Sequence, residues 1–107
     1  MPREFFSLSG DRVYRVGDGV NPPRVTHDPS PGYTKAARKA RLQGTVVLWL
    51  VVNRQGRPEQ VRVQRSLDDG LDWNAVEAVK RWRFEPATKD GQPVAVMINV
   101  EINFKLD

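Results

Sequence analysis

The sequence predicts an α+β fold: a three-stranded antiparallel sheet, made of a hairpin and a long C-terminal edge strand, with two helices packed on one face. Three observations predict this fold. Residues 94–106 alternate between large apolar side chains and small or polar ones, the period of a strand with one buried face. Residues 45–66 hold two strand-like runs around a Gly-containing loop, as in a β-hairpin. Residues 34–42 and 72–82 are rich in helix formers or carry a helical apolar stripe.

The chain divides near residue 33. Residues 1–32 are predicted to form a Pro- and Gly-rich arm, and residues 33–107 the folded domain. Four prolines and three glycines between Gly17 and Gly32 exclude a helix or a central strand there. Before them, residues 13–16 are expected to form one short strand.

Each helix has expected ends. Gly44 is expected to stop the first helix, whose alanines cluster on one side. Asp72 is the expected N-cap of the second helix. An apolar stripe would turn that helix toward the sheet; it comprises Leu71, Ala75, Val76, Val79 and Trp82.

The strand order follows from the pattern of each strand. Residues 45–53 are apolar on both faces, so they are expected at the centre of the sheet. Residues 59–66 alternate, with Val61 and Val63 inward, and Pro58 at their start suits an outer strand. Residues 94–106 then form the other edge. At about 3.3 Å per residue they make a longer strand than the neighbouring residues 45–53. We therefore expect part of this edge to be unpaired and available to another strand.

Composition narrows the function. The 107 residues include 17 Lys and Arg, 13 Asp and Glu, and no Cys. Without Cys the chain can form neither disulfides nor Cys-bound zinc, and His27 alone supports neither a His-based metal site nor a Ser/His relay. No apolar run approaches the roughly 20 residues of a membrane helix, and the N-terminus has no signal-peptide core. We therefore expect no catalytic residues, metal or cofactor.

The net charge of +4 leaves an alternative function, a small basic nucleic-acid-binding α/β module. The solvent-facing side of the strand at residues 94–106 weakens this alternative. It carries Ala95, Met97, Asn99 and Glu101 and no aromatic ring on which bases could stack.

Four stretches, in order, carry a family resemblance. Residues 33–38 read YTKAAR, residues 42–46 read LQGTV, residues 71–87 read LDWNAVEAVKRWRFEPA, and residues 90–94 read DGQPV. Over roughly residues 20–106 the chain resembles the TonB C-terminal domain family. The resemblance implies a non-enzymatic periplasmic domain that couples inner-membrane proton-motive energy to TonB-dependent outer-membrane transporters. It would do so by pairing a receptor segment, the TonB box, with the edge of its C-terminal strand.

The resemblance also implies site residues. Tyr33 matches the Tyr of the family's Tyr-Pro element, with Thr34 in place of the Pro, and Arg38 lies near basic residues that face the receptor. The main-chain ladder would come from residues 94–103. Its named members are Val94, Val96, Ile98, Asn99, Val100, Glu101, Ile102 and Asn103.

The implied partners are TonB-dependent receptors and inner-membrane motor proteins. Because such a transducer needs an inner-membrane anchor and a linker, the resemblance implies that the motor is reached through N-terminal regions absent from these 107 residues. We expect no nucleic-acid partner. The long unpaired strand leaves open a homodimer formed by strand exchange instead of a monomer.

Overall fold

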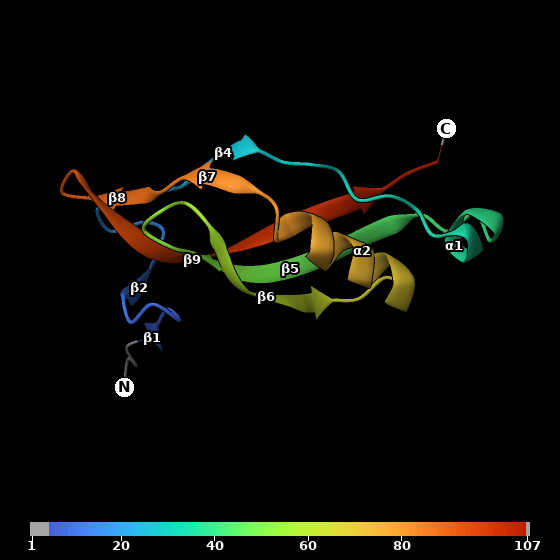
Figure 1. Cartoon of the computed structure of the whole chain (residues 1–107), viewed down its shortest axis with the longest axis horizontal. Helices are drawn as coiled ribbons and strands as arrows, with labels where there is room; N and C mark the ends of the chain where they lie inside the picture. The colour runs from blue at the N-terminus through green and yellow to red at the C-terminus, as the bar shows by residue number, and fades with distance from the viewer. Residues whose placement is uncertain (1–4, 107) are drawn as a thin grey trace.

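The computed structural model describes residues 5–106, so residues 1–4 of the predicted arm and residue 107 of the predicted domain lie outside the described part (Figure 1). The helices are α1 Lys35–Lys39 and α2 Asp69–Val79. Neither helix is long and apolar enough to cross a membrane. The strands are β1 Phe5–Phe6, β2 Arg12–Arg15, β3 Val20–Asn21, β4 Arg24–His27, β5 Gly44–Val52, β6 Pro58–Arg65, β7 Arg83–Glu85, β8 Ala87–Lys89 and β9 Gln92–Phe104.

The main sheet has the order β1-β2-β9-β5-β6, and β8 joins it by pairing with both β9 and β3. Strand β5 pairs antiparallel with β9 at nine consecutive positions, from Gly44 opposite Phe104 to Val52 opposite Val96. The α+β class and the central place of β5 are thus confirmed. The predicted three antiparallel strands are too few, because the described residues form a seven-stranded mixed sheet and a separate pair, β4–β7.

The chain between α2 and β9 forms two short strands that the sequence did not predict. Pro86 separates β7 from β8, and each of these strands has only three residues. Asp90 (φ 51°) and Gly91 (φ 78°) then turn the chain into β9. Both residues adopt left-handed backbone, the requirement of a tight two-residue hairpin turn.

Helix α2 covers one face of the sheet and, with β5, builds the core (Figure 1). Its inner face is formed by side chains that are at most 1% exposed: Leu71, Ala75, Ala78 and Val79. Val76 is only partly buried, and Trp82 follows the helix end. Val61 packs against this core as predicted, whereas Val63 lies at the rim of the sheet and is 41% exposed.

The helix ends differ from the prediction. In α1, Thr34 is the N-cap, and Arg41 (φ 55°) turns the chain before Gly44, which instead opens β5. In α2 the N-cap is Asp68, not Asp72, since Asp68 Oδ2 accepts a hydrogen bond from Leu71 N at 3.0 Å. The predicted cap lies inside the first turn of α2, where it binds the preceding loop.

Replacing Asp68 with alanine is expected to lower the free energy of unfolding by about 1 kcal/mol, because the cap hydrogen bond to Leu71 is lost. Denaturant unfolding measures this change. Asp69→Ala is the matched control, since Asp69 is an exposed carboxylate of the same turn and its loss removes the helix-dipole contribution alone. Equal losses in the two variants would contradict Asp68 as the cap.

The described residues of the arm, 5–32, contact the main sheet. On the sheet face opposite α2, Val13 of β2 packs with Val51 and Ala95 in a second apolar cluster. The ring of Phe5 lies 5.5 Å from that of Trp49. His27 is exposed and lies in β4, opposite Arg83.

Candidate partner-binding edge

The outer side of β9, away from β5, is only partly occupied. Strand β2 runs parallel to β9 and pairs at three positions, with Val13 opposite Ala95 and Arg15 opposite Met97. The chain then leaves the sheet edge through a turn closed by hydrogen bonds between Gly17 and Val20. Within residues 5–106 no strand pairs with the outer side of residues 98–104. We call residues 98–104 the free edge.

The structure divides the predicted ladder residues into two groups. Val94 lies opposite Ala87 of β8, and Val96 lies opposite Tyr14 of β2. The other six members lie on the free edge: Ile98, Asn99, Val100, Glu101, Ile102 and Asn103. A receptor ladder therefore stays a prediction for these six, and at Val94 and Val96 the chain itself already supplies a neighbouring strand.

The two faces of the free edge differ. Ile98, Val100 and Ile102 belong to the core on the α2 side, so packing holds their backbone in place. On the opposite face, Thr45 Oγ1 donates to Asn103 Oδ1 at 3.4 Å, and Asn99 Nδ2 donates to a glutamine of β6. An added strand would therefore pair with the main chain of the free edge, and its side chains would contact the polar side chains on the face opposite α2.

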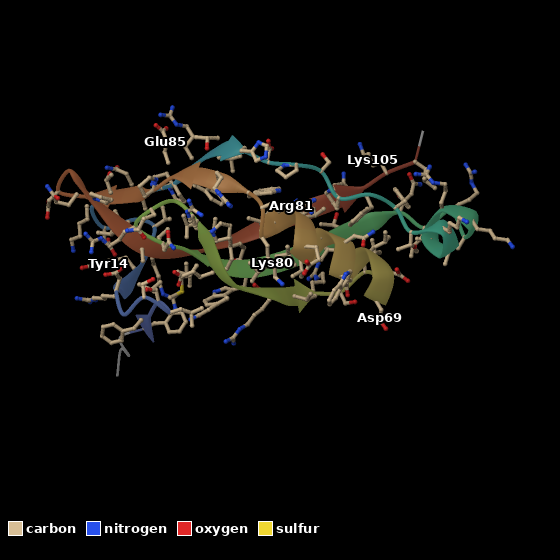
Figure 2. The ribbon with its side chains drawn as sticks, in the orientation of Figure 1. Tyr14, Asp69, Lys80, Arg81, Glu85 and Lys105 are labelled. Carbon is tan, nitrogen blue, oxygen red and sulfur yellow. The ribbon has the colours of Figure 1, made fainter. Side chains whose placement is uncertain are left out.

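An open groove of about 330 Å³ lies beside the free edge, between the second half of β9 and arm residues 28–33. The arm is tied down there, because Trp82 Nε1 donates to Pro29 O at 3.0 Å and Asn74 Nδ2 donates to Gly32 O at 2.7 Å. The groove mixes aromatic and charged side chains: Asp28, Tyr33, Trp82, Glu101, Phe104 and Lys105. Figure 2 shows Lys105 beyond the end of β9.

Tyr33 and Arg38 lie at the C-terminal end of the free edge. The Tyr33 ring meets Phe104 edge-on at 5.6 Å, and its hydroxyl donates to Leu42 O at 2.8 Å. Arg38 Cζ lies 5.3 Å from the centre of the Tyr33 ring, a cation–π distance. Thr34, in the place of the family's Pro, has a local role: its Oγ1 accepts from Ala37 N and starts α1.

The sequence did not reveal two features of this site. The first is the groove, because Asp28 and Pro31 reach β9 only through the fold of the arm. The second is the pairing of β2 with β9; residues 13–16 carried a strand signal, but nothing in them indicated the partner. Residues 5–106 hold no cluster of three or more His, Cys, Asp or Glu side chains that could bind a metal ion.

The fold and the free edge define a small α+β domain built around one long, partly unpaired C-terminal strand. The chain belongs to the family of Gram-negative bacterial TonB protein C-terminal domains, whose family model matches residues 29–106. Protein TonB of Vibrio cholerae serotype O1 is 38% identical over 87 residues, which are 80% of this chain and 36% of that protein. Protein tonB2 of Pseudomonas aeruginosa is 39% identical over 82 residues, 76% of this chain and 30% of that protein.

The chain therefore spans about a third of the length of these relatives. Among solved structures, the solution NMR structure of the Pseudomonas aeruginosa TonB CTD superposes with a TM-score of 0.67. The match covers 86% of this chain and 91% of that one at 22% sequence identity, so it establishes the fold alone.

Proposed function

We propose that this domain is the receptor-binding end of a TonB-type energy transducer. It lies in the periplasm, is anchored to the inner membrane and its motor proteins through segments outside these 107 residues, and grips TonB-dependent outer-membrane receptors. The observation that carries the proposal is the free edge of β9 in a chain of this family. The TonB box of a receptor would add a strand there.

The energetics suit a reversible grip. Each added main-chain hydrogen bond contributes about 0.5–1.5 kcal/mol net, and ordering the peptide offsets much of the sum. A handful of such bonds gives a Kd on the order of micromolar. Main-chain pairing depends little on the side chains of the added strand, so one domain could bind several receptors.

Tyr33 and Arg38 would contact the receptor at one end of this ladder. Tyr33 lines the groove, and packing against Phe104 fixes its ring. Arg38 is exposed, so its guanidinium can meet a receptor carboxylate without leaving the Tyr33 ring.

A titration of labelled protein with a synthetic ten-residue TonB-box peptide tests the proposal. We expect a Kd on the order of micromolar and amide shifts concentrated in residues 98–103. Two further peptides carry N-methyl groups on alternate amide nitrogens, one on the odd-numbered and the other on the even-numbered positions. Only alternate amides of a strand face a given neighbour, so one methylated peptide should lose at least about tenfold in affinity while the other, the matched control, binds nearly unchanged.

Three outcomes would contradict parts of this proposal. Amide shifts confined to α2 would refute docking at the edge. Single-stranded DNA that binds with a steep salt dependence, in the absence of any peptide response, would favour the nucleic-acid alternative. Sedimentation of a dimer that dissociates when peptide is added would show that a second copy occupies the edge in the free protein.

A further inference from the structure

We propose that β2 is a displaceable strand, which occupies residues 95–97 of β9 and leaves when a receptor segment pairs along the whole outer side of the strand. The inference rests on the proposed function and adds a closed and an open form of the same site. The N-terminal hairpin, residues 5–16 with β1 and β2, is the part that moves.

The position of β2 is the first reason. It pairs with the outer side of β9 at three positions directly before the free edge begins. Gly17 (φ 107°), Asp18 (φ 51°) and Gly19 (φ 88°) then turn the chain away. Val20 beyond this turn is 6% exposed and belongs to the main core, and β3 pairs with β8. The N-terminal hairpin can therefore hinge at residues 17–19 while the rest of the arm stays in place.

The independence of β9 is the second reason. Val96 and Met97, which face β2 on one side, pair with Val52 and Val51 of β5 on the other. Val96 is also fully buried in the core on the α2 side. Removing β2 would thus expose a formed strand edge without dissolving the sheet.

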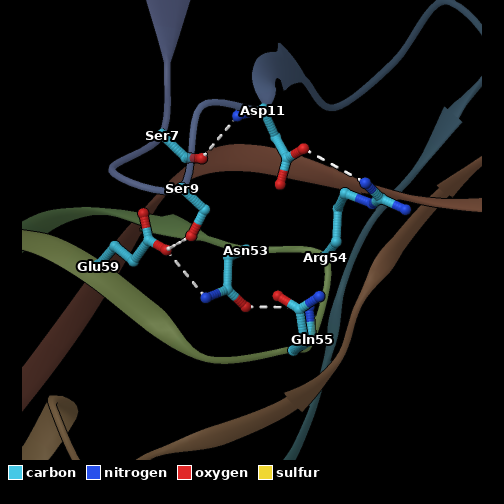
Figure 3. Close-up of polar contacts among 7 residues, drawn as sticks. All are labelled: Ser7, Ser9, Asp11, Asn53, Arg54, Gln55 and Glu59. Atoms are coloured by element: carbon cyan, nitrogen blue, oxygen red, sulfur yellow. Dashed lines mark hydrogen bonds and ion pairs between the residues drawn. The ribbon is translucent and has the colours of Figure 1, made fainter.

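The weak attachment of the N-terminal hairpin is the third reason (Figure 3). Glu59 of β6 accepts hydrogen bonds from Leu8 N at 2.9 Å and from Ser9 Oγ at 3.3 Å. Arg54 Nη1 lies 3.3 Å from Asp11 Oδ1 in a partly exposed ion pair. Such exposed polar contacts stabilise little.

The apolar contacts of the N-terminal hairpin are also few. Val13 is buried and Phe5 packs on Trp49, whereas Phe6 is 49% and Leu8 76% exposed. Tyr14, shown in Figure 2, packs only at the border of the main core, where Lys89 Nζ lies 5.0 Å from its ring. These contacts are sufficient to hold β2 against the outer side of residues 95–97. They are few enough that a competing strand could take the place of β2.

A disulfide that locks β2 onto β9 tests the proposal in the full chain. Val13 and Ala95 face each other across the two strands and share one apolar cluster, so Val13→Cys with Ala95→Cys can be cross-linked. The natural chain has no Cys, so oxidation is confined to this pair. With the TonB-box peptide as probe, the reduced variant should show amide shifts from position 95 onward. The oxidised protein should bind about tenfold more weakly, with shifts only in residues 98–103.

The matched control is Arg24→Cys with Glu85→Cys, which cross-links the exposed pair between β4 and β7 and leaves β2 and its contacts unchanged. Its oxidised and reduced forms should bind alike. A second variant, Phe5→Ala, removes the contact with Trp49, shifts the population toward the open form, and should tighten binding about threefold.

The two proposals fail in different ways. Equal affinities of the locked and unlocked Val13–Ala95 pair, with shifts in residues 98–103 in both, would overturn displacement of β2 and leave the proposed function intact. Absence of peptide binding in the unmodified chain and in the reduced variant would overturn both.

Discussion

Replacing Gly56 with alanine is expected to lower the free energy of unfolding by about 3 kcal/mol or more, which is a large share of the stability of a small domain. Gly56 lies in the β5–β6 turn with φ 79°, where only glycine fits without strain. A Cβ atom at this position would stand 1.9 Å from Phe84 O. The backbone of β7 would have to move, and the hydrogen bond from Phe84 N to Gly56 O, 2.9 Å long, would break.

Thermal unfolding and denaturant unfolding both measure this effect, and the matched control is Gly91→Ala. Gly91 also has a left-handed backbone, φ 78°, but nothing lies within 4 Å of its missing Cβ. The free energy of unfolding of the control should therefore fall by only about 1 kcal/mol, the cost of placing alanine in a left-handed backbone conformation. Similar losses in the two variants would show that the approach of β7 to the turn contributes nothing.

Replacing Asp72 with alanine should lower the free energy of unfolding by about 2–3 kcal/mol, because the polar groups that its carboxylate binds would lose their hydrogen-bond partner. Asp72 is 8% exposed, and it accepts hydrogen bonds from Ser66 Oγ and from the amides of Leu67 and Asp68 at 2.9 and 3.4 Å. Together these bonds tie the loop between β6 and α2 to the first turn of the helix. Asp69→Ala, an exposed neighbour in that turn, is again the control.

The same carboxylate makes stability depend on pH. Burial by itself raises the pKa of Asp72, but the hydrogen bonds from Ser66, Leu67 and Asp68 outweigh it and hold the pKa below its ordinary value. A lowered folded-state pKa stabilises the protein fully above the unfolded-state pKa, and this contribution is lost as pH falls through the folded-state value. The stability difference between the natural chain and Asp72→Asn should therefore be constant above about pH 5 and shrink below about pH 4. A difference that does not change across this range would contradict the role of the charge.

Strongly periodic segments were the predictable part of the fold. The alternation of residues 94–106 predicted the longest strand, found as Gln92–Phe104, because half of its side chains must enter one core. The run around Trp49, apolar on both faces, predicted the central strand, because both of its faces must be covered. The stripe from Leu71 to Val79 predicted the inner face of α2.

Features set by a few residues or by distant neighbours were not predictable. Strands β7 and β8 are three residues long and flank Pro86, so neither shows a period. Asp68 and Asp72 both precede helical residues, and only the direction of each side chain decides which one caps α2. The pairing of Val13 with Ala95 joins segments about 80 residues apart, and the sequence carries no local signal for it.

The nine paired positions between β5 and β9 also determine how the domain would yield under load. A pull directed along β9 shears all nine positions at once, so they share the force. A pull on Phe5 directed across the sheet, away from β9, loads the three positions of β2 one after another. The same kind of hydrogen bond therefore gives one mechanically strong junction and one weak one. Such a pull would rupture the weak junction first and leave the strand that carries the free edge intact.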